Sequence, residues 1–140
     1  MKSLSIITIN YNDAEGIKKT INSVKSQTDK RFEYVVIDAA SSDKSFEVIQ
    51  KNKEHIDKWI SEPDDGIYQG MNKGIIKSTG EYLLFLNSGD ILANQNVIES
   101  IYQIDPKSDI VYGNLLFDND GVLIEKKFPN DIDLHYLITK

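Results

Sequence analysis

Residues 81–90 read Glu81-Tyr82-Leu83-Leu84-Phe85-Leu86-Asn87-Ser88-Gly89-Asp90. The apolar run from Tyr82 to Leu86 predicts a strand that is buried on both faces, as the strands of a parallel sheet are. Four polar or flexible residues then end this run abruptly. In open α/β sheets, ligands bind in the crevice beyond the carboxyl ends of the strands. We therefore expect a functional site where this strand ends.

Asp90 is the residue of this stretch that indicates a chemistry. A carboxylate on a short loop suits a hard cation such as Mg²⁺ or Mn²⁺, and such a cation suits a diphosphate. Asn87 would add a neutral oxygen or a hydrogen bond, and Gly89 would let the backbone approach the ligand. The alternative, from the residues alone, is a polar turn in which Asp90 caps the next helix.

The composition is that of one globular domain. The chain has 140 residues, of which 40% are hydrophobic and 27% charged. The net charge of −6 argues against nonspecific binding to nucleic acid, which needs Lys and Arg. The lack of cysteine excludes disulfides, thiolate zinc sites and a cysteine nucleophile. No signal peptide or transmembrane segment is predicted, so we expect a cytoplasmic protein, with peripheral association at the inner membrane face as the open alternative.

Strand and helix signals alternate along the chain. Strands are predicted at residues 4–9, 32–37, 59–60, 81–86 and 109–112, and a β-hairpin at 115–127. Four helices are predicted from apolar spacing: one capped by Asp13, one after Asp43 that extends to Ile56, one at 67–78 with an apolar face at 67, 71 and 75, and one at 96–103. This alternation predicts an α/β fold with a mainly parallel sheet, helices on both faces and a C-terminal β-hairpin.

Polar residues also follow the first two predicted strands. Asp38 ends the second strand, where a carboxylate accepts a hydrogen bond from a base N–H or from ribose hydroxyls, unless it is a turn residue. Tyr11, between Asn10 and Asn12, ends the first strand. Its ring either stacks on a nucleobase or packs under the first helix.

The segment from Asp64 to Gly74 offers a third group of candidates. The helix that begins near Gly66 would aim backbone N–H groups at an anion. Asn72 and Gly74 both cost helix propensity, which indicates close packing or contact. Lys73 is more typical of a solvated helix lysine than of a phosphate ligand. The two histidines, at positions 55 and 135, are interpreted as structural or solvated.

Together these segments resemble the family 2 glycosyltransferases, whose nucleotide-sugar transferase fold is called GT-A. The resemblance covers roughly residues 3–127. The pieces that carry it occur in the family's order: 5–12, 35–43, 61–68, 71–74, 79–82 and 85–90.

The resemblance implies an enzyme that binds a nucleotide-diphosphate sugar and transfers the sugar, with inversion, to a hydroxyl of a glycan or lipid-linked acceptor. The family's usual setting is bacterial polysaccharide or glycan synthesis. Asp90 matches the metal-binding acid, which implies Mg²⁺ or Mn²⁺, and Asp38 matches the base-binding acid. The expected nucleotide-binding residues are Thr8, Asn10, Tyr11, Asn12, Asp38, Asp64, Asn72, Asn87 and Ser88.

The sequence departs from the family pattern at several points. Ala39 stands where a second acid is frequent, and Met71 stands where many relatives carry Arg. Residues 87–90 keep only the final carboxylate, so we expect weak metal binding until the diphosphate adds its oxygens.

The general base of the family comes from the segment after the hairpin, and we assign no residue to it, because nothing marks Asp131 or Asp133 as catalytic. We therefore expect residues 1–140 to be a single nucleotide-sugar-binding domain that is truncated before the acceptor-binding part. Such a part would be weak or inactive alone, and its exposed apolar surface would favour a homodimer.

Three other functions are considered. A receiver domain needs an acidic pair after the first strand and a Lys after the last core strand, which fits poorly here. A nucleotidyltransferase for sugar phosphates usually has a Gly-rich basic loop after its first strand, which this sequence lacks. A nucleotide-binding module without catalysis fits the missing general base, and it stays open as the alternative.

Overall fold

The computed structural model describes residues 3–129 and divides the chain into two units, Met1–Asp105 and Pro106–Lys140. The first unit is built on a four-stranded parallel sheet in the order β3-β2-β1-β4. Its strands are β1 (Leu4–Asn10), β2 (Phe32–Asp38), β3 (Lys58–Ser61) and β4 (Tyr82–Phe85). Its helices are α1 (Ala14–Lys25), α2 (Ser45–Lys51), the 3₁₀ helix η1 (Lys53–His55), α3 (Ile67–Lys77) and α4 (Val97–Ile104).

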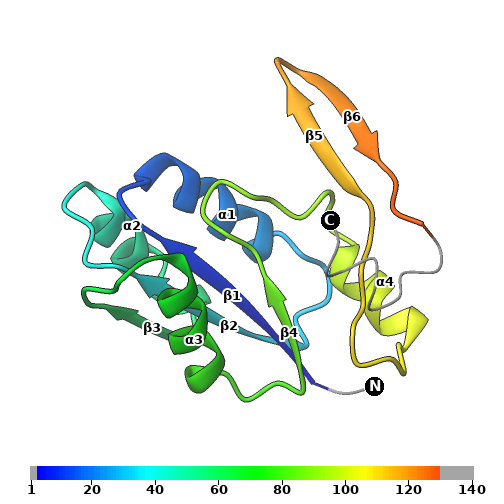
Figure 1. Cartoon of the computed structure of the whole chain (residues 1–140), viewed down its shortest axis with the longest axis horizontal. Coiled ribbons are helices and arrows are strands. Elements are labelled where there is room, and N and C mark those ends of the chain that lie inside the picture. The colour runs from blue at the N-terminus through cyan, green and yellow to red at the C-terminus, as the bar shows by residue number, and fades with distance from the viewer. Residues whose placement is uncertain (1–2, 130–140) are drawn as a thin grey trace. The chain divides into compact units, whose positions relative to one another are not determined.

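Helices cover both faces of this sheet, as the alternation predicts (Figure 1). On one face, residues of β1 and β2 pack against α1, α2 and α4 in a single apolar cluster. On the other face, β1 and β2 pack against α3. All seven residues of β1 are buried, because this strand lies between β2 and β4 and under helices on both sides.

The helix α3 packs on the sheet through glycine rather than through its predicted apolar face. A Cβ atom at Gly74 would lie 2.4 Å from Cγ2 of the buried Ile7, so only glycine lets the two backbones approach this closely. The predicted face at positions 67, 71 and 75 is wrong in part, because Ile67 is 48% exposed and Ile75 is 46% exposed. The close packing expected at Gly74 is confirmed.

Two further predictions about the first unit are wrong. The strand β4 is only half-buried along its length, because it is the edge strand of the sheet and lacks a neighbour on one side among the described residues. The helix after Asp43 ends at Lys51 instead of continuing to Ile56, which is nevertheless buried just after η1. The predicted cap of α1 is confirmed, since Gly16 N donates to Asp13 Oδ1 at 2.9 Å.

The second unit contains the predicted hairpin, formed by β5 (Leu115–Asn119) and β6 (Val122–Lys126). Asp120 and Gly121 both have positive φ, 52° and 86°, as a tight two-residue hairpin turn requires. The strand predicted at 109–112 is wrong: this segment has no regular secondary structure and no ladder pairing, and its apolar side chains are exposed.

Several sequence-based expectations fall on other parts of the chain. His55 is exposed within η1, as expected, whereas Asp131, Asp133 and His135 lie outside the described residues. Between residues 3 and 129, no helix is long and apolar enough to cross a membrane.

Candidate functional site

Polar side chains form a row along the carboxyl-terminal edge of the sheet. Asn10, Asp38 and Ser61 end β1, β2 and β3, and they are direct neighbours in the ladder register. Ser88 extends the row beyond β4, because its backbone N donates to Ile9 O at 3.0 Å and its hydroxyl donates to Asn10 Oδ1 at 2.8 Å. Three of the predicted residues, Asn10, Asp38 and Ser88, therefore meet at one edge of the sheet.

Asp38 lies at the centre of this row and is fully buried. Its Oδ1 accepts hydrogen bonds from Asn10 Nδ2 at 2.7 Å and from Ser41 Oγ at 2.6 Å. Its Oδ2 accepts from Ser41 N at 3.1 Å and from Ser61 Oγ at 2.6 Å. These four donors satisfy the roughly four acceptor positions of a carboxylate. The sequence identified Asp38 but not its bonds from Ser41, three residues further on, and from Ser61 on the neighbouring strand.

Tyr11 stands on a turn whose two flanking residues are fixed. Asn12 N donates to Ser41 Oγ at 2.8 Å, and Asn12 Oδ1 accepts from Ser42 N at 2.8 Å. Asn12 has φ 49°, a left-handed conformation that Asn tolerates better than most residues. The Tyr11 side chain is 67% exposed, so it does not pack under α1, and its ring is free to meet a ligand.

The loop at residues 87–90 is held by one buried hydroxyl. Thr20 Oγ1, in the middle of α1, accepts from Gly89 N at 3.0 Å and lies 2.8 Å from Asp90 O, to which it donates. Gly89 has φ 93°, a conformation that side chains rarely adopt. We did not predict this role for Thr20. The available signal is that Thr20 is a polar residue within the apolar stripe of α1.

The donor atoms near this loop fit a hard cation. The carboxylate of Asp90 is exposed, and the structure gives it no hydrogen bond or ion pair with the other described residues. Asn87 Oδ1 is buried without a hydrogen-bond partner, and Asp13 Oδ2 would lie 3.7 Å from a Cβ atom at Gly89. Within residues 3–129, no group of three or more His, Cys, Asp or Glu side chains could hold a metal. The oxygens of Asp90 and Asn87 are of the type that a hard cation binds.

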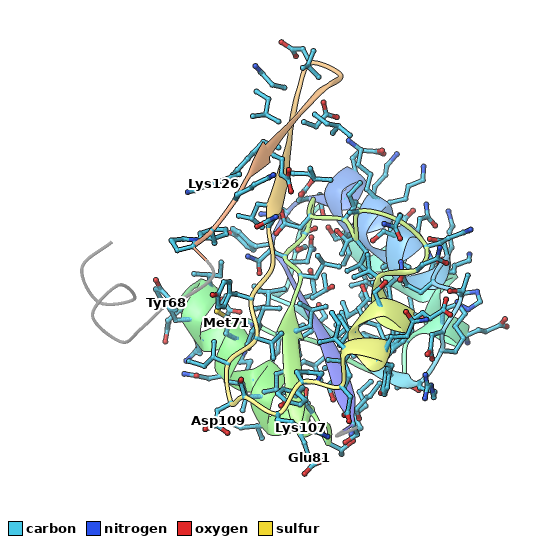
Figure 2. All side chains as sticks on the ribbon, turned by 90° about the vertical axis from the view of Figure 1, so that its right-hand side faces the viewer. Tyr68, Met71, Glu81, Lys107, Asp109 and Lys126 are labelled. Atoms are coloured by element: carbon cyan, nitrogen blue, oxygen red, sulfur yellow. The ribbon has the colours of Figure 1, made fainter. Side chains whose placement is uncertain are left out.

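The start of α3 supplies a second acceptor without a partner. Asp64 Oδ1 accepts from Gly66 N at 3.0 Å, whereas Asp64 Oδ2 is buried with no hydrogen-bond partner. A Cβ atom at Gly70 would lie 3.2 Å from this oxygen. Figure 2 shows Tyr68 and Met71 near the start of this helix, with Glu81 beyond its far end.

The remaining residues considered above, Thr8, Lys73 and Asn72, lie in three different environments. Thr8 is fully buried, and its hydroxyl lies 3.0 Å from the hydroxyl of Tyr34, whose pKa is raised by burial. The Thr8 side chain therefore lies in the core and does not reach the edge of the sheet. Lys73 Nζ is held by Pro63 O at 2.8 Å and by Glu62 Oε1 at 3.0 Å. Asn72 is exposed on α3.

Comparison with known protein sequences gives a consistent result. The family model described as Glycosyl transferase family 2 matches residues 5–136. An uncharacterized glycosyltransferase of Mycobacterium tuberculosis (strain ATCC 25618 / H37Rv) is 37% identical over 97 residues, which are 69% of this chain and 37% of that protein. A PGL/p-HBAD biosynthesis glycosyltransferase of Mycobacterium bovis (strain BCG / Pasteur 1173P2) is 28% identical over 118 residues, which are 80% of this chain and 46% of that protein. The chain thus spans less than half the length of these relatives.

Solved structures share the fold. S. aureus TarS 1-349 in complex with UDP-GlcNAc superposes with a TM-score of 0.66 at 25% identity, over 74% of this chain and 31% of that one. The mannosyltransferase PcManGT from Pyrobaculum calidifontis, in complex with GDP-Man and Mn²⁺, also has a TM-score of 0.66, at 18% identity, over 73% of this chain and 32% of that one. The match with PcManGT supports the fold alone.

Proposed function

This chain belongs to glycosyl transferase family 2, and we propose that it is the donor-binding part of an inverting glycosyltransferase. Its substrate would be a nucleotide-diphosphate sugar, and its acceptor a hydroxyl of a glycan or lipid-linked molecule. One observation carries this proposal: the polar row at the ends of four strands is accompanied by an exposed aromatic residue, Tyr11, directly after β1, and by an exposed acidic residue, Asp90, on the loop after β4. That arrangement suits a ligand with a flat base and linked phosphates.

The nucleotide would lie across the edge of the sheet. In this proposal Tyr11 stacks on the base, because its ring is exposed while the backbone on either side is held. Two buried acceptors without partners, Asp64 Oδ2 and Asn87 Oδ1, would receive hydroxyl or N–H donors of the ligand. The proposed nucleotide site comprises Asn10, Tyr11, Asn12, Asp64, Asn72, Asn87 and Ser88, and Asp38 is buried next to Asn10 at the same edge.

The diphosphate would need positive charge beside it. Lys73 is already held by Glu62 and by a backbone carbonyl. We propose that Asp90 holds Mg²⁺ or Mn²⁺. The hydrogen bonds of the Thr20 hydroxyl with Gly89 N and Asp90 O would fix the backbone that carries Asp90. Such a cation supplies charge stabilisation to the departing diphosphate. PcManGT, which shares the fold, was solved with GDP-Man and Mn²⁺.

The transfer itself would be an in-line displacement at the anomeric carbon. The acceptor oxygen would form its bond on the face opposite the leaving nucleotide diphosphate, and a carboxylate would take the acceptor proton. We assign this general base to none of the residues between 3 and 129. The Mycobacterium bovis relative is named a PGL/p-HBAD biosynthesis glycosyltransferase, and TarS was solved with UDP-GlcNAc; both support sugar transfer from a nucleotide-sugar donor in a biosynthetic role. Pairing of two copies of the chain stays a prediction.

A thermal-shift panel with UDP, GDP, dTDP and CMP, each with and without Mn²⁺, tests this proposal. A ligand that binds only the folded state adds RT ln(1 + [L]/Kd), about 2.7 kcal/mol at 100 times Kd, and raises Tm by several degrees. We expect a shift only when a nucleoside diphosphate and Mn²⁺ are both present, so CMP should give none. The shift should disappear in Asp90→Ala.

Glu54→Ala is the matched control, because it removes an exposed carboxylate from η1, before the opposite end of β3. It should keep the full shift of the parent chain. A metal-dependent shift that survives in Asp90→Ala would contradict the proposed metal site. Nucleotide binding without sugar transfer, even after any native downstream residues are restored, would favour the nucleotide-binding module instead.

A further inference from the structure

We propose that Asp38 is a positioning residue that never touches the nucleotide and acts by setting the turn that carries Tyr11. The proposal rests on the function proposed above. Its first support is that Asp38 is 0% exposed and already accepts four hydrogen bonds from protein donors. A base N–H or a ribose hydroxyl would have to displace one of these donors from a buried carboxylate, which is costly. The role proposed here for Asp38 therefore differs from the direct contact with the base that the sequence led us to expect.

The influence of Asp38 passes through the hydroxyl of Ser41. This hydroxyl has one proton, which it donates to Asp38 Oδ1 at 2.6 Å. Its lone pairs then face the two remaining donors, Asn10 Nδ2 at 3.2 Å and Asn12 N at 2.8 Å. Without an acceptor at position 38, the Ser41 hydroxyl would be free to rotate and would cease to hold both donors. Asp38 thus sets the direction of a hydroxyl that binds both neighbours of Tyr11.

The turn that carries Tyr11 needs this support. Asn12 adopts a left-handed φ of 49°, which costs an ordinary residue on the order of 1 kcal/mol and is kept only where contacts hold it. The contacts that hold it are made by Ser41 and Ser42. The exposed ring of Tyr11 is consequently presented on a backbone fixed before the ligand arrives, and such preorganisation improves affinity.

The same carboxylate is linked to the loop of Asp90 by one further residue. Asn10 donates to Asp38 with its amide nitrogen and accepts from Ser88 Oγ with its amide oxygen. Ser88 precedes Gly89 and Asp90 in the loop. Loss of the Asp38 carboxylate should therefore weaken the binding of every nucleoside diphosphate by a similar factor. Neither the turn that carries Tyr11 nor the loop of Asp90 distinguishes one base from another.

Titration calorimetry of UDP, GDP, dTDP and CDP with Mn²⁺ tests this inference on the parent chain, Asp38→Asn, Tyr11→Ala and the double variant. We expect Asp38→Asn to raise the Kd of every nucleoside diphosphate that binds about tenfold, the equivalent of one lost hydrogen bond. The ratios between these Kd values should stay unchanged. In the Tyr11→Ala background, Asp38→Asn should raise Kd less than about threefold, because the ring that the turn presents is already gone. Amide hydrogen exchange at Asn12 should also become faster in Asp38→Asn.

The matched control is Glu33→Gln, the same chemical change at the other end of β2. It should lower the stability of the fold and leave all four Kd values and the Asn12 exchange rate unchanged. If Asp38→Asn does not fold, Ser41→Ala should reproduce its pattern. Selective loss of one base, fully additive effects of the two substitutions, or unchanged affinity would each overturn the inference. A parent chain that binds none of the four diphosphates would overturn the proposed function and this inference with it.

Discussion

Glu33 ties three parts of the sheet together at the end opposite the candidate site, and its removal is the sharpest test of how this fold is held. Its Oε1 lies 2.6 Å from Lys58 Nζ, and its Oε2 accepts from Ser5 Oγ at 2.5 Å and from Thr79 N at 2.8 Å. The Glu33 side chain is only 15% exposed. Strands β1, β2 and β3 and the connection into β4 therefore all meet at one carboxylate.

The magnitude follows from the pKa of Glu33. Burial alone raises this pKa, but the hydrogen bonds from Lys58, Ser5 and Thr79 outweigh burial and lower it from 4.5 to about 2. A difference of one in pKa corresponds to 1.36 kcal/mol, so the ionised Glu33 contributes up to about 3 kcal/mol to the free energy of unfolding. Because the folded-state pKa is lowered, this contribution is complete above the unfolded-state pKa near 4.5. It is lost as pH falls from there towards 2.

We expect Glu33→Gln to lower the free energy of unfolding by about 2–3 kcal/mol at pH 7, which corresponds to roughly 10 °C in Tm for a chain of this size. Urea melts of the parent and the variant between pH 3 and pH 7 measure this difference. The gap between the two proteins should narrow below pH 4.5, because the parent then loses the charge that the variant lacks.

Glu62→Gln is the control, because Glu62 also pairs with a lysine, at 3.0 Å, but its side chain is 55% exposed. Exposed pairs contribute 0–1 kcal/mol, so this variant should stay within about 1 kcal/mol of the parent. A Glu33→Gln gap below 1 kcal/mol at pH 7, or a gap that stays constant down to pH 3, would refute the reasoning.

Two further substitutions test the packing around the site. Thr20→Val removes the hydroxyl that Gly89 N bonds at 3.0 Å, and it should cost about 1–3 kcal/mol in urea melts and weaken Mn²⁺-dependent nucleotide binding. Gly74→Ala would place a methyl group 2.4 Å from Cγ2 of Ile7, and the clash should exceed the gain of about 1 kcal/mol in helix propensity. We expect a net loss of about 1–2 kcal/mol in the same melts. Thr28→Val, at an exposed hydroxyl, and Gly113→Ala, where a Cβ meets nothing within 4 Å, are the matched controls and should be near neutral. Equal losses in a variant and its control would contradict these assignments.

Local sequence signals predict the elements that depend on neighbouring residues. The cap at Asp13 and the apolar spacing of α1 need only the next few residues, and both are confirmed. The positive φ values of Asp120 and Gly121 likewise belong to the turn itself. The errors arise where a distant partner decides. The burial of β4 depends on its place at the edge of the sheet, and the segment at 109–112 is apolar but has no strand beside it among the described residues.

The candidate site divides in the same way. The sequence alone determined that polar residues follow the apolar strands, because the alternation of strand and helix brings parallel strand ends to one edge. It therefore placed Asn10, Asp38, Ser88 and Asp90 at that edge. Only the tertiary structure decided which of these residues face a ligand. Asp38 is sealed by donors from three separate segments, whereas Asp90 is left open. The bonds from Asn10 and Ser61 to Asp38, and from Ser88 to Asn10, join residues that are 23 to 78 positions apart, and such distant pairs leave no periodic trace in the chain.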